Sequence, residues 1–245
     1  MSGSVGGCDR VVLITGGARR MGRAMALDMA CQGYRVAITY RESRAEALST
    51  VTDCRALGVE AEAFRLDVRL EAEIAATAAA VVERFGAVDA LVNNAAVFDT
   101  LALEAMTAER WDAAFAVNVR GPMLMTQAVL PQLRARNGRV VHLGSLGGSR
   151  AWPSHAHYCS AKAALEMLTR TMARAYAPEV SVNCVAPGWI EMDDVSETAE
   201  RFAARTPMGR NGKAEDVAAA VRFFLTGPEF ITGQILAVDG GLGLV

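Results

Sequence analysis

The chain has 245 residues, of which 52% are apolar and 21% are charged, and its formal net charge is −2. This composition suits a soluble α/β protein, and the scattered lysines and arginines argue against a nucleic-acid-binding or membrane-binding surface. The five cysteines are widely spaced without a C-x-x-C pair, so they predict neither a disulfide framework nor a metal site. No apolar run is long enough to span a membrane, and we expect a cytoplasmic protein.

Short apolar runs alternate with helical patterns along the chain. The runs that predict strands are residues 11–14, 35–40, 61–66, 88–92, 140–143, 180–185 and 234–238. Helical spacing separates them, with one long helical stretch over 108–136 and an irregular polar segment ending near residue 205. This alternation predicts a flexible tail over 1–9 and a single α/β domain over 10–245. That domain would be a doubly wound, parallel, seven-stranded sheet with helices on both faces.

The first predicted strand runs directly into a glycine-containing turn, residues 15–22 (TGGARRMG), and a helical pattern follows. Strand, glycine loop and helix together form the context that a nucleotide-binding turn requires. Glycines let the backbone approach a pyrophosphate, and the helix N-terminus offers it free N–H groups. We therefore predict a dinucleotide site at this turn.

The residues after the second strand bear on the choice of cofactor. Arg41 and Ser43, with Arg19 from the glycine turn, would surround the 2′-phosphate of NADPH. Glu42 would instead favour NAD if it turned toward the ribose hydroxyl. We favour NADPH/NADP⁺ on the two arginines.

A second group of polar residues begins where the fifth strand ends. Tyr158 and Lys162 are four residues apart and share one face of a predicted helix. A nearby ammonium lowers the pKa of a phenol toward the range of efficient acid–base catalysis, and Ser145 at the strand end would hold a substrate oxygen. The glycine turn, Asn94, Ser145 and Pro187 all follow strands, so they would converge at the carboxyl edge of the sheet.

These motifs resemble the short-chain dehydrogenase/reductase family over nearly the whole chain. The matching features are the glycine turn, the Asn93-Asn94-Ala95 run, Asn118, Ser145, Tyr158-x-x-x-Lys162 and Pro187-Gly188. The resemblance implies a Rossmann-like, NADPH-dependent oxidoreductase that interconverts ketones and alcohols and assembles as a homotetramer, or as a homodimer. It implies that Tyr158 donates a proton, Ser145 positions the reacting oxygen, Lys162 lowers the Tyr158 pKa and Asn118 supports a water relay to Lys162.

The resemblance also implies a set of cofactor contacts along the carboxyl edge of the sheet. They are Gly16, Arg19, Arg20, Met21, Gly22, Tyr40, Arg41, Ser43, Asp67, Val68, Asn94, Ala95, Ala96, Tyr158, Lys162, Pro187, Gly188 and Ile190. The expected substrate contacts are Phe98, Ser145, Trp152, Tyr158 and Trp189, beneath a lid over about 189–205. We expect His155 and His157, which lie near this pocket in sequence, to be solvated loop histidines.

Two departures leave the substrate open. Arg20 stands where the family usually has glycine, and this form of the turn, together with Phe98, resembles the pteridine reductases, in which a phenylalanine stacks on the pterin ring. Ser145 favours ketone chemistry, as in 3-oxoacyl-[acyl-carrier-protein] reductases, because the pteridine reductases usually carry aspartate there. A carbonyl reductase is therefore the first hypothesis and a pteridine reductase the second. A non-catalytic NADPH sensor is disfavoured because Tyr158 and Lys162 are both present.

Overall fold

The computed structural model describes residues 9–191 and 197–245. Most of the predicted tail and residues 192–196 of the predicted lid lie outside the described residues. The strands are β1 (Val11–Ile14), β2 (Arg35–Tyr40), β3 (Ala61–Arg65), β4 (Ala90–Asn93), β5 (Arg139–Leu143), β6 (Ser181–Pro187) and β7 (Ile235–Val238). They form one parallel seven-stranded sheet in the order β3-β2-β1-β4-β5-β6-β7, which confirms the predicted fold class.

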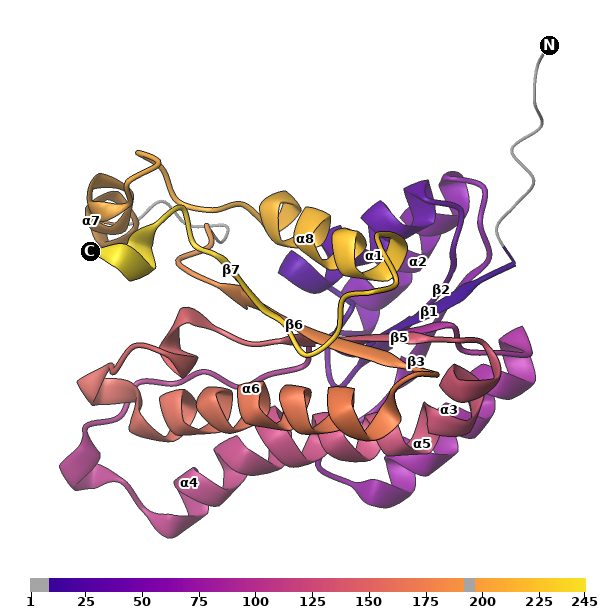
Figure 1. Cartoon of the computed structure of the whole chain (residues 1–245), viewed down its shortest axis with the longest axis horizontal. Coiled ribbons are helices and arrows are strands. Elements are labelled where there is room, and N and C mark those ends of the chain that lie inside the picture. The colour runs from indigo at the N-terminus through magenta and orange to yellow at the C-terminus, as the bar shows by residue number, and fades with distance from the viewer. Residues whose placement is uncertain (1–8, 192–196) are drawn as a thin grey trace.

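Helices cover both faces of this sheet. They are α1 (Arg20–Cys31), α2 (Arg44–Ala56), α3 (Glu71–Phe85), α4 (Ala108–Phe115), α5 (Gly121–Ala135), α6 (Ala156–Tyr176), α7 (Glu197–Arg205) and α8 (Ala214–Thr226). In Figure 1, α1, α2 and α8 lie on one face, and α3, α4, α5 and α6 lie on the other. The strand order reverses between β1 and β4, and in such sheets this switch point marks the ligand crevice at the carboxyl ends of the strands.

Two predicted segments differ from the structure. The stretch predicted as one long helix over 108–136 contains a π-helical turn, Ala116–Arg120, between α4 and α5. The segment predicted to be irregular up to residue 205 ends in a helix, α7. That helix is short and has apolar residues at helical spacing, Ala199, Phe202 and Ala203, but only Ala199 is buried.

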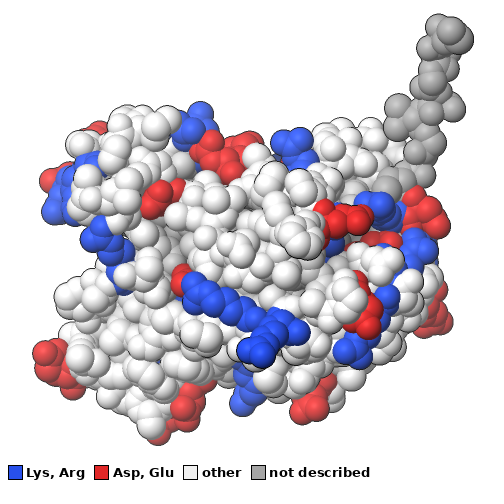
Figure 2. Space-filling view, in the orientation of Figure 1, with Lys and Arg blue, Asp and Glu red and all other residues white. Residues whose placement is uncertain are grey.

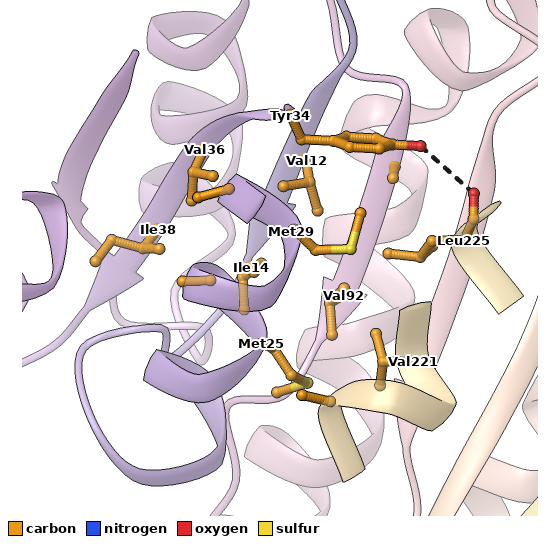
Figure 3. Packing of buried hydrophobic residues seen from close by; sticks show 14 of the residues in the cluster. Val12, Ile14, Met25, Met29, Tyr34, Val36, Ile38, Val92, Val221 and Leu225 are labelled. Carbon is orange, nitrogen blue, oxygen red and sulfur yellow. Dashed lines mark hydrogen bonds between the residues drawn. The ribbon is translucent and has the colours of Figure 1, made fainter. Parts of the chain in front are cut away.

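The core has two layers, one on each face of the sheet. On one face Met25 and Met29 of α1 and Val221 of α8 pack against the strands, as Figure 3 shows. The hydroxyl of Tyr34 donates to the carbonyl of Leu225 at 3.4 Å beside this layer. Strand residues such as Ile14 and Leu13 belong to opposite layers and are both fully buried, which explains the continuous apolar runs in the sequence. The two layers make a rigid platform for the loops at the carboxyl edge.

One buried polar network interrupts this core. His142 of β5 is fully buried, and its Nδ1 lies 3.2 Å from Nδ2 of Asn93 in β4. The same Asn93 nitrogen lies 3.1 Å from Oγ1 of Thr126 in α5. Burial, together with the positive charge of Lys162, lowers the pKa of His142 to about 3.

This histidine should make folding stability depend on pH. An unfolded histidine titrates near pH 6.5, so between about pH 6.5 and 3 the unfolded chain binds a proton that folded His142 does not. The free energy of unfolding should fall by about 2 kcal/mol between pH 7 and pH 5 through this group alone. Urea unfolding of the wild type and of His142→Asn at both pH values checks this. The variant should lose less stability on acidification, and an equal loss in both proteins would contradict the assignment.

Candidate active site

The glycine turn is packed so tightly that side chains are excluded from two of its positions. Gly16 has a φ of +63°, and a Cβ atom placed on Gly22 would lie 2.1 Å from the Gly16 carbonyl oxygen. The Nδ2 atom of Asn94 donates to the carbonyl oxygens of Thr15 and Gly16, at 2.9 Å each. Asn94, predicted as a cofactor contact, therefore uses its amide nitrogen to brace the turn against the end of β4.

The N-terminus of α1 offers backbone donors just beyond this turn. Arg19 precedes the helix with extended backbone and makes no side-chain capping bond, and the first helical turn has no acidic residue. The first N–H groups of a helix have no partner within the helix, so they suit an anion. Arg20 has a φ of +53°, a backbone conformation that glycine adopts without strain. This conformation is a physical reason for the glycine that related turns usually carry at this position. The turn and these donors together fit the pyrophosphate of a dinucleotide.

Charged side chains gather beyond the ends of β2 and β3. Nη2 of Arg41 lies 2.9 Å from Oε1 of Glu42, so the acidic residue that left the cofactor choice open is paired with the arginine. Nε of Arg69 donates to Oδ1 of Asp67 at 2.9 Å, and this pairing lowers the pKa of Asp67. Sequence reasoning did not identify Arg69, which lies beside the predicted cofactor residue Asp67. Ser43 precedes α2 without a side-chain capping bond.

The remaining predicted cofactor residues all lie at the carboxyl edge of the sheet. Met21 is in the first turn of α1, Tyr40 ends β2, Val68 follows β3, Ala95 and Ala96 follow β4, Pro187 ends β6, and Gly188 and Ile190 follow it. The Ala95 amide donates to Oγ1 of Thr15 at 3.1 Å, and the Gly188 amide donates to the Val238 carbonyl at 3.0 Å. These bonds fix the loops after β4 and β6 to their neighbouring strands.

The structure brings Ser145, Tyr158 and Lys162 together at the end of β5. Ser145 is buried directly after the strand, and its Oγ accepts a hydrogen bond from the Gly147 amide at 3.1 Å. Tyr158 lies in the first turn of α6, and Lys162 lies one turn later and is buried. Nζ of Lys162 donates to the Leu143 carbonyl at 2.7 Å and lies 5.6 Å from the centroid of the Tyr158 ring.

The electrostatics of this group differ from the sequence-based expectation. Burial raises the pKa of Tyr158, and a hydrogen bond with Ser145 offsets part of that rise. The pKa of Tyr158 is thus raised rather than lowered as expected, and the Lys162 ammonium group is bonded to the Leu143 carbonyl. Burial lowers the pKa of Lys162 itself to about 8. Tyr158 is therefore protonated at neutral pH, the state that a proton donor needs.

The side chain of Asn118 holds the backbone of the segment after β4. It is buried in the π-helical turn, and turns of this kind often occur at functional sites. Its Oδ1 accepts from the Val97 amide and its Nδ2 donates to the Val97 carbonyl, both at 3.0 Å. The side chain is therefore occupied in holding the segment after β4, and its support of a water relay to Lys162 stays a prediction.

Aromatic side chains stand beside Tyr158. Phe98 is 57% exposed, and its ring meets the Tyr158 ring at a steep angle, with the centroids 4.8 Å apart. The Trp152 ring is nearly parallel to the Tyr158 ring, at a centroid distance of 6.3 Å. Trp189 stacks instead on Phe202 of α7, at 4.2 Å. Two of the three predicted aromatic substrate contacts thus lie next to Tyr158, and the third packs within the lid segment.

His157 is not the solvated loop histidine that was expected, whereas His155 does keep part of its surface exposed. His157 is almost fully buried, with Nε2 2.5 Å from Oδ1 of Asp99. His155 is partly buried, with its ring stacked on Phe98 at 4.7 Å. The sequence contained only a weak signal of the contact between His157 and Asp99: the carboxylate directly follows Phe98, and the histidine directly precedes Tyr158.

Other kinds of site find no support in the described part of the chain. Within residues 9–191 and 197–245, no three His, Cys, Asp or Glu side chains are grouped so that they could hold a metal ion. Among the same residues, none of the helices combines the length and the apolar content that crossing a bilayer demands. Figure 2 shows acidic and basic residues interspersed on one face of the molecule, much of which is uncharged.

Comparisons with known proteins agree with this geometry. The family model described as Enoyl-(Acyl carrier protein) reductase matches residues 16–243. A 3-oxoacyl-[acyl-carrier-protein] reductase of Staphylococcus epidermidis is 35% identical over an alignment of 241 residues, and the match covers 96% of this chain and 99% of that protein. A short-chain dehydrogenase/reductase of Serratia marcescens superposes with a TM-score of 0.91 at 32% identity, over 96% of this chain and 98% of the other.

The structure of a third similar protein was solved with bound ligands. The gluconate 5-dehydrogenase of Burkholderia cenocepacia, in complex with NADP and tartrate, has a TM-score of 0.89 at 31% identity, and the match covers 96% of each chain. The match of the family model and the full-length relatives agree with the parallel sheet, the glycine turn and the Ser145–Tyr158–Lys162 group. The chain therefore belongs to the short-chain dehydrogenase/reductase family of oxidoreductases.

Proposed function

We propose that this protein reduces the ketone group of a small molecule with NADPH, in the manner of a 3-oxoacyl reductase, and that Ser145, Tyr158 and Lys162 form its catalytic centre. The observation that carries the proposal is the grouping of these three side chains, Ser145 and Lys162 buried and Tyr158 partly buried, at the sheet edge that also holds the glycine turn. The Staphylococcus epidermidis relative, named for 3-oxoacyl reduction, supports the ketone, and the NADP complex of the Burkholderia cenocepacia protein supports the cofactor.

The chain's own groups would divide the work as follows. The glycine turn and the first turn of α1 would hold the cofactor pyrophosphate, and the bound nicotinamide supplies a hydride. Ser145 would donate a hydrogen bond to the carbonyl oxygen of the substrate. Tyr158, protonated because burial raises its pKa, would give its proton to that oxygen as it becomes a hydroxyl. Lys162, whose lowered pKa of about 8 lies near neutral pH, would hold positive charge beside the phenol and help to restore its proton.

Arg41 is the residue that we expect to select NADPH. Arg41 directly follows β2, and its side chain is 43% exposed. Its guanidinium group would contact the 2′-phosphate, with Ser43 and Arg19 nearby. Arg41→Ala should raise the Kd of NADPH by about tenfold and that of NADH much less, because a charge-assisted hydrogen bond contributes about 1.5–3 kcal/mol. Fluorescence titration measures both constants. Arg84→Ala, which removes an arginine of α3 that is paired with Glu60 and Glu62 outside the proposed site, is the control. Equal weakening of both cofactors would place the phosphate contact elsewhere.

A pteridine substrate is the second candidate. The exposed Phe98 ring beside Tyr158 favours it, because a planar heterocycle would stack there, and Arg20 is exposed on the glycine turn. Ser145 favours the ketone. A pterin and a ketone would both lie against Tyr158, so measured turnover of each compound has to distinguish the two candidate substrates.

The test is NADPH oxidation with a panel of substrates, run in parallel with NADH. The panel holds an acetoacetyl thioester, small diketones, cyclic ketones, dihydrobiopterin and a crotonyl thioester, the last because the family model is described as an enoyl reductase. Ketone turnover is expected. Turnover of dihydrobiopterin alone would favour the pteridine function. NADPH binding without turnover of any compound would favour the non-catalytic sensor.

We also propose a cytoplasmic homotetramer, with a homodimer as the alternative. Support comes from β7, an edge strand of the sheet on which Leu236 is exposed, and from Phe230 just before it, which is fully exposed. Met167 is exposed on the outer side of α6. Burying such apolar groups against further copies of the chain would stabilise an assembly. Light scattering on the purified protein measures the mass directly, and a monomer at micromolar concentration would contradict the proposal.

A further inference from the structure

A polar pair, formed by a buried histidine and a partly exposed aspartate, lies next to the proposed catalytic tyrosine in the chain, because His157 directly precedes Tyr158. Nε2 of His157 lies 2.5 Å from Oδ1 of Asp99, and His157 is 1% exposed. The second carboxylate oxygen of Asp99 lies 3.6 Å from Nη2 of Arg110 in α4. The hydrogen bond from His157 lowers the pKa of Asp99, so the carboxylate is ionised at neutral pH. This pair joins the segment after β4 to the first turn of α6, across 58 positions of sequence.

Contacts on both sides of the pair join the same two segments. The Leu101 amide donates to the Ser154 carbonyl at 2.8 Å, and Oγ1 of Thr100 lies 3.1 Å from Nε2 of His155. Phe98 precedes Asp99, and its ring contacts both His155 and Tyr158. Of these contacts, the one between Asp99 and His157 involves the most deeply buried side chain. Phe98 is 57% exposed, so burial of its own side chain does little to hold it beside Tyr158.

The chemistry of His157 indicates that the pair does more than fill space. Its Nδ1 is buried and has no hydrogen-bond partner within residues 9–191 and 197–245. An unpaired polar atom in the interior is unfavourable, and a leucine at this position would avoid it. What the imidazole adds over an apolar side chain is the bond from Nε2 to Asp99. The ring is therefore suited to positioning the Asp99 segment rather than to packing alone.

We infer that Asp99 and His157 are positioning residues that hold Phe98 against Tyr158, and that they thereby set a preference for ketones carrying a planar or aromatic substituent. This inference rests on the proposed ketone reductase function. A planar substituent beside the carbonyl would pack on the exposed ring of Phe98, next to the Tyr158 hydroxyl, and aromatic contacts of this kind stabilise a bound ligand. A small aliphatic ketone would reach Tyr158 without touching Phe98.

Two diketones that differ by one group test the preference. In 1-phenyl-1,2-propanedione a phenyl group replaces one methyl group of 2,3-butanedione. Asp99→Ala and His157→Leu should each raise KM for the phenyl compound by at least about tenfold, which corresponds to about 1.4 kcal/mol, and change that for 2,3-butanedione by less than threefold. Phe98→Leu should do the same. The Kd of NADPH should stay within twofold in all three variants.

Conservative variants and a double variant separate positioning from general damage. His157→Gln keeps a side-chain N–H donor and Asp99→Asn keeps an acceptor oxygen, so both should retain most of the wild-type preference. The double variant Asp99→Ala/His157→Leu should be no worse than either single variant, because the two residues act through one contact. Equal losses on both diketones, or additive losses in the double variant, would overturn the inference.

Hydrogen exchange gives a readout that does not depend on turnover. In His157→Leu the Leu101 amide, which is bonded to Ser154, should exchange at least about tenfold faster. The Val97 amide, which is bonded to Asn118, should be unchanged. Unchanged exchange at Leu101 would overturn the positioning role even if the enzyme reduced no ketone. Faster exchange in a protein that reduces neither diketone would leave the positioning role intact and reject the proposed function and the substrate preference that rests on it.

Discussion

Tyr158→Phe should lower kcat for ketone reduction by about 10²–10⁴-fold, the usual contribution of a positioned general acid. The phenol is buried in the first turn of α6 with its pKa raised, so it carries the proton that the product hydroxyl requires. Phenylalanine keeps the ring contacts with Phe98 and Trp152 and removes only the hydroxyl. The Kd of NADPH should therefore change by less than about threefold. Stopped-flow measurement of NADPH oxidation and fluorescence titration report the two quantities.

The matched control for this substitution lies on the same helix. Tyr176 ends α6, far from Ser145, and Tyr176→Phe removes an equivalent hydroxyl. This variant should retain wild-type turnover. Turnover near the wild-type rate in Tyr158→Phe would reject Tyr158 as the proton donor. Loss of NADPH binding together with turnover would instead assign the Tyr158 hydroxyl to the cofactor.

Gly22→Ala should raise the Kd of NADPH at least about 100-fold or prevent stable folding. The added methyl group would lie 2.1 Å from the Gly16 carbonyl oxygen and 2.9 Å from the Gly17 Cα atom, and these backbone atoms can move only if the turn changes shape. Overpacking of this kind costs about 1–3 kcal/mol in a core and more where backbone must move. Thermal unfolding with and without NADPH measures both effects, because a ligand that still binds raises the Tm.

Gly58→Ala is the control for this prediction. Gly58 also has a positive φ, +88°, but a Cβ atom there meets no other atom within 4 Å. It should lose about 1 kcal/mol of stability from backbone strain and bind NADPH normally. If Gly22→Ala fails to fold, Asn94→Ala tests the turn more gently, since it removes only the two bonds from Nδ2 to Thr15 and Gly16. A Gly22→Ala protein that folds and binds NADPH as the wild type does would show that the turn is not the cofactor cradle.

The sequence by itself determined the architecture and the set of residues at the sheet edge. Strands buried on both faces are mainly apolar, so β1 is visible in the sequence as the run Val11–Ile14. A turn with no room for a side chain must carry glycine, so Gly16 and Gly22 mark it. Tyr158 and Lys162 share a helix face through local geometry alone. Each of these features depends on neighbours a few positions away, which is why the pattern of residues reveals it.

Only the tertiary structure decided how those residues are partnered. Lys162 donates to the carbonyl of Leu143, both polar side-chain atoms of Asn118 bond to Val97, and the buried His157 meets the partly exposed Asp99. None of these contacts follows from periodicity, because packing brings together segments that are distant in sequence. The pKa of Tyr158 is likewise raised, rather than lowered, because desolvation outweighs the hydrogen bond with Ser145. Burial and orientation, which only the folded chain has, set the chemistry of groups that the sequence names.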